Sequence, residues 1–171
     1  PPRAGAMIEA LRGLGYSTAA ALADIVDNSI SANASRVEIV FAWSGSSSSI
    51  SVLDDGRGMH DDELQTAMTL GDKSPLDARD FRDLGRFGMG LKTASFSQCR
   101  RLTVGTARDG SRSCLRWDLD ELAKDPSGGW LLFEGPAAGS DSYFDPLAVR
   151  EHGTMVLWEE MDRIVTLGYT Q

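Results

Sequence analysis

Hydrophobic residues follow a helical period at the N-terminal end of the chain. The pattern predicts a first helix over residues 6–14, which Gly15 would end in a left-handed cap. Ser17 then has the position of an N-cap for a second helix that runs to about Ser31, with its larger apolar residues on one side. The chain is therefore expected to open with two consecutive helices.

Farther along the chain, alternating apolar positions predict a sheet. The expected strands cover residues 36–43, 50–53, 102–107, 113–119, 130–133 and 154–158. The first two should form a hairpin across a serine-rich turn, and Asp109-Gly110 predicts a tight turn between the next two. Further helices are expected over residues 61–70 and 91–98. We therefore expect a single domain over residues 1–171, an α+β two-layer sandwich with helices packed on one face of a mostly antiparallel mixed sheet.

Composition narrows the class of protein. The 171 residues are 42% hydrophobic and 25% charged, which is typical of a globular domain with a sizeable core. The longest apolar runs fall far short of the roughly 20 residues that cross a bilayer, so we expect a soluble, cytoplasmic protein without a membrane partner. The two cysteines and two histidines lack zinc-ligand or C-x-x-C spacing, which argues against a structural metal or a disulfide framework. Because the chain opens with Pro-Pro rather than Met, we expect a domain excised from a longer protein.

Charge is distributed unevenly along the chain. The net charge is −8, yet the stretch from Asp72 to Arg116 holds ten basic and five acidic residues, so it carries +5 and the remainder −13. An acidic body argues against direct nucleic-acid binding by this domain, because affinity for a phosphate backbone needs a basic face. The basic stretch from Asp72 to Arg116 could bind a compact anion, or it could be a solvated surface of mixed charge.

A stripe of small polar side chains runs along the second predicted helix. Its members, spaced i, i+3, i+4 and i+7, are Asp24, Asp27, Asn28 and Ser31. This spacing puts them on one helix face. A solvated face would more readily contain Lys, Glu or Arg, which favour helices. The alternative is a site for a hard cation or its waters, since a carboxylate and an amide oxygen one turn apart are suitable ligands.

Acidic and glycine residues end the second predicted strand, in the segment Asp54-Asp55-Gly56-Arg57-Gly58-Met59. A plain β-turn would explain the glycines. A carboxylate at a strand end can also accept a hydrogen bond from a ligand amine. From the residues alone, both interpretations stay open.

A second glycine-rich segment, Leu84-Gly85-Arg86-Phe87-Gly88-Met89-Gly90-Leu91-Lys92-Thr93, opens a predicted helix. Helix N-termini present free N–H groups to anions, and glycines let the backbone approach phosphate closely. The spacing does not fit a Walker A loop, because one residue separates Gly90 from Lys92, and Thr93 stands where a dinucleotide fingerprint needs its third glycine. We therefore expect a phosphate-binding loop of another kind.

Taken together, the order and spacing of these segments resemble one family. They are similar to the ATP-binding domain of the GHKL superfamily (the Bergerat ATP-binding fold), which includes gyrase B subunits, large heat-shock chaperones, histidine kinases and mismatch-repair ATPases. The matching segments are Asp24-Ile25-Val26-Asp27-Asn28-Ser29 for the first motif, Asp55-Gly56-Arg57-Gly58-Met59 for the D-x-G-x-G motif, Gly85 to Gly90 for the second glycine motif, and Gly153-Thr154 for the late Gly-Thr. Gly-Met-Gly-Leu-Lys-Thr-Ala-Ser and Val-Asp-Asn-Ser are most similar to the microrchidia (MORC)-like branch, bacterial relatives included.

The resemblance implies a site for ATP and Mg²⁺. Asp24 would be the catalytic base that activates water, and Asn28 would bind Mg²⁺ through its side-chain oxygen. Asp55 would bind the adenine amino group, with Thr154 supporting the adenine pocket. The other implied nucleotide-binding residues are Gly58, Met59, Lys73, Gly85, Arg86, Phe87, Gly88, Met89, Gly90, Leu91, Thr93 and Lys92, the last of which would reach the phosphates. Residues 71–87 would form the ATP lid.

Two departures from the family concern hydrolysis. Asp24 stands where ATP-hydrolysing members usually have Glu, and Ser31 stands near a position where Asp is common, so we expect slow turnover. The resemblance implies Mg²⁺-dependent binding of ATP and ADP and slow hydrolysis, with lid closure coupled to conformational change or homodimerisation of a longer protein. One alternative is a nucleotide-binding switch with little or no hydrolysis. A histidine-kinase catalytic domain is less favoured, because neither histidine lies in a helical phospho-acceptor context.

Overall fold

The computed structural model describes residues 4–13, 16–69, 90–125, 127, 129 and 131–163. Its helices are α1 (Ala4–Arg12), α2 (Thr18–Ser31), α3 (Asp61–Met68), α4 (Gly90–Phe96), α5 (Leu119–Lys124) and α6 (Asp145–Ala148), with short 3-10 helices η1 (Gly45–Ser47) and η2 (Asp141–Phe144). Its strands are β1 (Val37–Ala42), β2 (Ser49–Asp54), β3 (Arg101–Arg108), β4 (Ser111–Asp118), β5 (Phe133–Glu134) and β6 (Gly153–Glu159). Within these ranges, no helix combines the length and apolar character that a membrane span requires.

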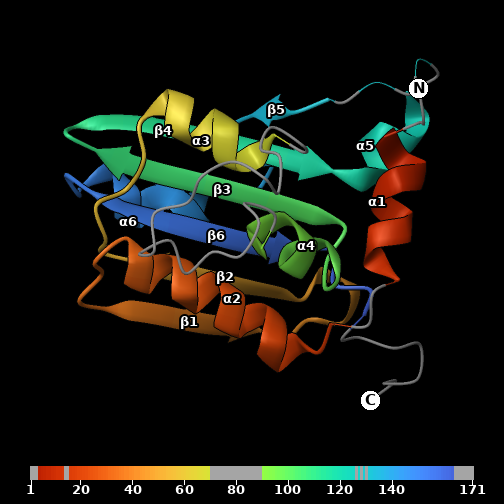
Figure 1. The fold of residues 1–171 in the computed structure, drawn as a ribbon, viewed down its shortest axis with the longest axis horizontal. Coiled ribbons are helices and arrows are strands. Elements are labelled where there is room, and N and C mark those ends of the chain that lie inside the picture. Colours follow the sequence, from red (N-terminus) through yellow and green to blue (C-terminus); the bar gives the residue numbers. More distant parts are fainter. Residues whose placement is uncertain are drawn as a thin grey trace, which may run out of the picture.

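The strands of the described residues form one sheet in the order β1-β2-β6-β3-β4-β5. Each pairing between these neighbours is antiparallel. Strand β6, the last one among the described residues, lies between the two hairpins, β1–β2 and β3–β4, and so joins them into one sheet. Figure 1 shows α2, α3 and α4 across one face of this sheet and α6 behind it. The predicted α+β sandwich is confirmed, although the sheet is antiparallel rather than mixed across these strands.

Two clusters of buried apolar side chains hold the layers together. The larger lies between the helices and the sheet, and in it Phe96 of α4 packs edge to face against Trp117 of β4, with ring centroids 6.3 Å apart. The smaller lies on the opposite face, where Leu147 of α6 packs against Met155 of β6 and other strand residues. The expectation that helices cover one face was therefore incomplete, since α6 covers part of the other.

Local signals placed most of the predicted elements within a few residues of their observed bounds. The Ser17 hydroxyl accepts a hydrogen bond from the Ala20 N–H at 3.1 Å and so caps α2, as predicted. Asp109 and Gly110 have φ values of +50° and +79°, the left-handed conformation of a tight hairpin turn. The predicted strand over 130–133 is shorter and later in the structure, as β5. The hydrophobic pattern did not reveal α5, η2 or α6, which are only six, four and four residues long and therefore too short to repeat a helical period.

The predicted first strand is present as β1, but much of its apolar face is exposed. Ile39 and Phe41 share the helix side of the sheet with their β2 partners, and Trp43 follows directly after the strand. The Phe41 and Trp43 rings stack with centroids 6.2 Å apart, yet Trp43 is 61% exposed. Because β1 lies at the edge of the sheet, alternation predicted the strand correctly without predicting its burial.

Candidate functional site

A row of polar side chains interrupts the apolar face of the sheet beneath α2. Asp54, at the end of β2, pairs with Thr154 of β6, and Thr154 pairs with Thr106 of β3. Directly paired residues lie on the same face of a sheet. Two residues away along their strands, Val52 and Val156 belong to the larger core, so this row faces the helices as well. The core therefore ends in a polar floor at this edge of the helix layer.

Asp54 contributes a buried carboxylate to this floor. The residue is 6% exposed, and its Oδ2 accepts a hydrogen bond from the Ser29 hydroxyl of α2 at 2.8 Å, while Oδ1 accepts from the Gly56 N–H at 2.9 Å. Burial raises the pKa of Asp54, and the donors from Ser29, Gly56 and the Thr154 backbone offset this only in part. These donors do not use all of the roughly four acceptor positions of a carboxylate, so a ligand donor can still bind.

The neighbouring Asp55 carboxylate binds a different part of the backbone. Its Oδ1 accepts hydrogen bonds from the N–H groups of Ser35 at 2.7 Å and Arg36 at 2.8 Å, which closes the connection between α2 and β1. These backbone donors, with Arg36 the stronger, hold the pKa of Asp55 below its usual range. The carboxylate of Asp55 thus has a structural role on the side of the chain away from the polar floor.

This division of roles changes the motif assignment made from the sequence. In D-x-G-x-G spacing the acid stands two residues before the first glycine, and in this chain that residue is Asp54, followed by Gly56 and Gly58. The structure agrees with the strict spacing, because Asp54 lies beside Thr154 on the polar floor. The strict spacing assigns the motif's acid position to Asp54, one residue before the Asp55 of the sequence prediction. Adjacent side chains at a strand end point to opposite sides, so a shift of one residue decides which carboxylate faces the helices.

Two glycines allow the loop after β2 to pass close to its neighbours. A Cβ at Gly56 would lie 2.8 Å from the Ala32 Cβ, and one at Gly58, which has φ +67°, would lie 1.9 Å from the Ala107 carbonyl oxygen. The following residue, Met59, donates its N–H to the Thr106 Oγ1 at 2.8 Å. The loop is therefore anchored to the end of the polar floor.

The predicted stripe on α2 is exposed only in part. Asp24, Asn28 and Ser31 are half-buried, whereas Asp27 is exposed. The Asp24 Oδ2 accepts a hydrogen bond from the Tyr16 hydroxyl at 2.7 Å. Because Ser29 on the same helix binds Asp54, α2 is fixed over the polar floor with its half-buried polar residues along one side.

The second glycine-rich segment enters the described structure at Gly90, where α4 begins. Lys92 is 2% exposed, and its ammonium group donates to the Thr69 carbonyl at the end of α3. Leu91 and Met59 are partly buried and pack against the larger core. The remaining predicted residues of this segment and its lid lie outside the described residues: Lys73, Gly85, Arg86, Phe87, Gly88, Met89 and the range 71–87.

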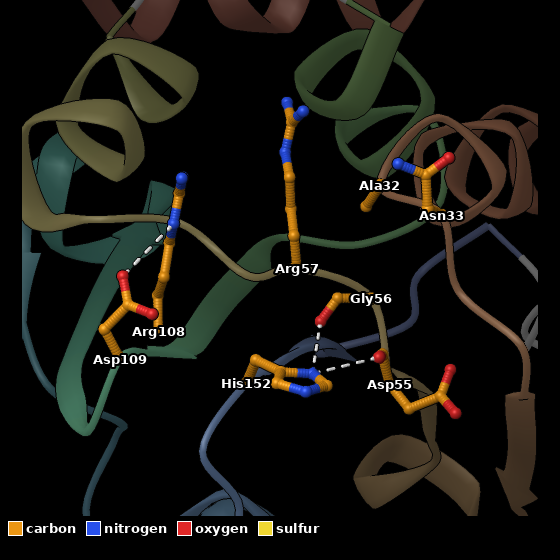
Figure 2. A pocket seen from close by; sticks show the side chains of 8 residues that line it. All are labelled: Ala32, Asn33, Asp55, Gly56, Arg57, Arg108, Asp109 and His152. Carbon is orange, nitrogen blue, oxygen red and sulfur yellow. Dashed lines mark hydrogen bonds and ion pairs between the residues drawn. The ribbon is translucent and has the colours of Figure 1, made fainter.

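A hollow of about 410 Å³ lies beside the loop that follows β2 (Figure 2). Its lining residues are Ala32, Asn33, Asp55, Gly56, Arg57, Arg108, Asp109 and His152. The His152 Nδ1 lies 3.2 Å and 3.1 Å from the carbonyl oxygens of Asp55 and Gly56, so it acts as the donor. Figure 2 shows the Arg57 side chain extending from this loop toward the helix layer. The hollow adjoins the glycine loop but does not include the α2 stripe, Lys92 or Thr154.

The tertiary structure thus brings several predicted residues near α2. Asp24 and Asn28 lie on α2 itself, and Thr154 lies on the polar floor beneath it. Half-buried Thr93 is carried by α4, which packs against α2. Sequence reasoning did not single out Ser29, Thr106 or Tyr16. Ser29 was inside the first motif, while the other two gave no local signal.

Several known proteins are similar to parts of this chain. It is 33% identical over 90 residues to the ATPase morc-1 of Caenorhabditis elegans, covering 53% of this chain and 10% of that protein. It is 35% identical over 94 residues to the DNA mismatch repair protein MutL of Rhodospirillum rubrum, covering 54% of this chain and 15% of the relative. It is 38% identical over 104 residues to the MutL of Paramagnetospirillum magneticum, covering 59% of this chain and 16% of that protein. The chain spans less than a fifth of the length of each.

A family-level match covers the segments that build the site. The family described as histidine kinase-, DNA gyrase B- and HSP90-like ATPases matches residues 16–154, which include α2, the glycine loop after β2, α4 and the start of β6. This range is most of the chain, and the resemblance found in the sequence motifs agrees with it. The chain therefore belongs to the histidine kinase-, DNA gyrase B- and HSP90-like ATPases, the GHKL family.

Proposed function

We propose that this domain binds ATP together with Mg²⁺ and hydrolyses the nucleotide slowly. The observation that carries the proposal is the buried Asp54 carboxylate on a polar floor beneath α2, the helix that also presents Asp24 and Asn28. A relative of this chain is named an ATPase, which supports the same activity. In longer proteins that contain the domain, the nucleotide would drive closure of residues 71–87 and homodimerisation, without direct contact to nucleic acid.

Asp54, rather than Asp55, would bind the adenine amino group. It is buried and held rigidly by Ser29 and Gly56, and it retains acceptor capacity toward a donor. A nucleobase amine would satisfy that capacity in a site that excludes water. Thr154, the cross-strand partner of Asp54, would line the same pocket.

Asn28 suits Mg²⁺ as a single protein ligand. Among the described residues there is no group of three or more His, Cys, Asp or Glu side chains that could hold a metal ion by themselves. Mg²⁺ usually keeps several waters and takes one or two protein oxygens plus substrate phosphates, so the half-buried Asn28 amide fits this requirement. The ion, when bound, would neutralise charge on the phosphates.

Asp24 would act one helical turn from Asn28 as the general base. Its carboxylate would take a proton from water while the water oxygen forms a bond to the γ-phosphorus. The bond from that phosphorus to the β–γ bridging oxygen would break, and ADP would leave. Asp is one methylene shorter than Glu, and phosphoryl transfer depends on positioning, so turnover would be slow.

Lys92 would contribute to phosphate binding from α4. In the structure its ammonium group donates to the Thr69 carbonyl, so contact with a phosphate requires that this bond be exchanged or shared. We expect Lys92 to contribute to binding when the γ-phosphate is present.

A nucleotide-binding switch is the second candidate function, because Asp24 replaces the longer acid of hydrolysing members.

Single-turnover hydrolysis with excess protein and Mg²⁺ separates these two functions. The parent chain, Asp24→Asn and Asp27→Asn should be compared, the last being a matched control because it makes the same substitution at an exposed position of the same helix. We expect Asp24→Asn to lower turnover by a factor of about 10²–10⁴, as loss of a general base does, and Asp27→Asn to leave it unchanged. ATP binding without turnover in the parent would favour the switch, and absence of ATP binding by calorimetry would overturn both.

A further inference from the structure

The Tyr16 hydroxyl is hydrogen-bonded to the Asp24 carboxylate, eight residues farther along the chain. The hydroxyl lies 2.7 Å from the Asp24 Oδ2. Tyr16 directly precedes Ser17, the N-cap of α2, and Asp24 is in the second turn of that helix. The phenol therefore extends along the first two turns of α2, a geometry that helix formation alone does not impose.

The backbone of Tyr16 is itself held by a buried amide at the end of α4. The Gln98 Nε2 donates to the Tyr16 carbonyl oxygen at 3.0 Å, and the Gln98 Oε1 accepts from the Thr18 hydroxyl at 2.7 Å. Gln98 is 2% exposed, so this clamp is protected from water. Through Gln98 the position of the phenol is fixed relative to α4, the helix that carries Lys92.

The contact restricts what the Asp24 carboxylate can do. Asp24 is half-buried, and a short carboxylate in that setting has more than one accessible rotamer. The phenol donor occupies Oδ2, which leaves Oδ1 available to a water molecule. The hydrogen bond to Asp24 also raises the pKa of Tyr16, so the phenol keeps its proton at neutral pH and stays a donor.

We infer that Tyr16 is a positioning residue for Asp24, one that holds the carboxylate in the orientation from which Oδ1 takes the proton of the attacking water. The inference rests on the proposed function of Asp24 and deepens it. A base one methylene shorter than Glu gains most from a fixed orientation, because misplacement by about 1 Å can cost a hundredfold in rate. Tyr16 is 36% exposed, so its hydroxyl would otherwise be free to bind water.

A double-mutant comparison tests this role. Tyr16→Phe removes only the hydroxyl, and we expect kcat to fall about tenfold while KM and ADP affinity stay within twofold. In an Asp24→Asn background the same substitution should have no further effect on the residual rate. Tyr143→Phe is the matched control, because it removes a tyrosine hydroxyl bonded to Ser49 at 2.8 Å in another part of the fold. That control should leave hydrolysis unchanged.

This comparison distinguishes failure of the inference from failure of the proposed function. A parent chain without turnover overturns the proposed hydrolysis. With turnover in the parent, normal kcat in Tyr16→Phe, or an equal fall in both backgrounds, overturns the inference alone. A loss of ADP affinity parallel to kcat would likewise assign Tyr16 a purely structural role.

A second measurement tests the contact without any hydrolysis. The ring ¹³C signal of Tyr16, assigned by its disappearance in Tyr16→Phe, can be titrated with pH by NMR in the parent and in Asp24→Asn. We expect the apparent pKa of Tyr16 to fall toward the ordinary value of 10.0 in Asp24→Asn. An unchanged titration would show that the contact does not form in solution, which would overturn the inference even where the parent hydrolyses ATP.

Discussion

Asp54→Asn should separate nucleotide binding from fold stability. The new amide can accept from the Gly56 N–H through its oxygen and donate through its nitrogen to the Ser29 Oγ. The Ser29 hydroxyl already lies 3.5 Å from the Ile25 carbonyl oxygen and can turn to it. The Gly56 N–H and the Ser29 hydroxyl therefore each keep a partner, and a buried charge is removed. We therefore expect the free energy of unfolding without nucleotide to stay within about 1 kcal/mol of the parent or to rise.

Nucleotide affinity, unlike stability, should fall in Asp54→Asn. An amide NH₂ group in place of a carboxylate oxygen would leave the adenine amino group facing another donor. An unpaired buried donor costs about 1–3 kcal/mol, more when the lost acceptor was charged, and every 1.4 kcal/mol corresponds to about tenfold in affinity. We therefore expect ATP and ADP to bind at least about tenfold more weakly, as measured by calorimetry.

Asp54→Ala gives the contrasting result on stability. It leaves the Gly56 N–H without its buried acceptor, whereas the Ser29 hydroxyl can turn to the Ile25 carbonyl oxygen, so we expect a cost of about 1–3 kcal/mol. In a domain of this size about 1 kcal/mol shifts Tm by roughly 2–4 °C, so Tm should fall by about 2–12 °C. A smaller shift than in Asp54→Asn would contradict the hydrogen-bond assignment.

The pH dependence of these shifts follows from the raised pKa of Asp54. For an acid whose folded-state pKa exceeds its unfolded value, protonation stabilises the fold. That contribution is complete below the ordinary value of 3.8 and is lost as pH rises through the folded-state pKa. The Tm of Asp54→Asn relative to the parent should therefore rise between about pH 4 and neutrality. A Tm difference between Asp54→Asn and the parent that does not change with pH would show that the buried Asp54 charge does not destabilise the fold.

Asp55→Asn is the matched control at the adjacent position. Its carboxylate binds the Ser35 and Arg36 N–H groups rather than facing the polar floor, so nucleotide affinity should not change. Because the folded-state pKa of Asp55 is lowered, its stabilising contribution is present above the ordinary value and is lost as pH falls through the folded-state pKa. A tenfold loss of affinity in Asp55→Asn with none in Asp54→Asn would refute the reassignment of the motif.

Three further predictions concern the rest of the site. Asn28→Ala should lower ATP affinity in Mg²⁺ to the value that the parent shows in EDTA, and calorimetry in both buffers would reveal any remaining Mg²⁺ dependence. A non-hydrolysable ATP analogue, but not ADP, should slow proteolysis within residues 71–87, and equal cleavage in all states would exclude a lid there. Gly58→Ala should abolish folding or lower Tm sharply, because its Cβ would overlap the Ala107 carbonyl oxygen at 1.9 Å, and thermal unfolding measures this.

Elements whose signals are local were predictable from the sequence. The Ser17 cap and the Asp109-Gly110 turn each depend on a few consecutive residues, and both are present as predicted. The same holds for α2 and the β1–β2 hairpin, whose periods are encoded within single elements. The family was recognisable as well, because its glycines and acids stand at fixed spacings that the backbone requires.

Tertiary packing decided which of these residues share a site. The polar floor joins Asp54, Thr154 and Thr106 from three strands, because β6 inserts between two hairpins that are separate in the sequence. Strand pairing over such separations depends on the whole core rather than on local propensity. Likewise, packing beneath α2 decides which side of the chain Asp54 and Asp55 face. The Tyr16 hydroxyl bonds to Asp24 while Gln98, at the end of α4, binds the Tyr16 backbone, a contact between segments far apart in the sequence.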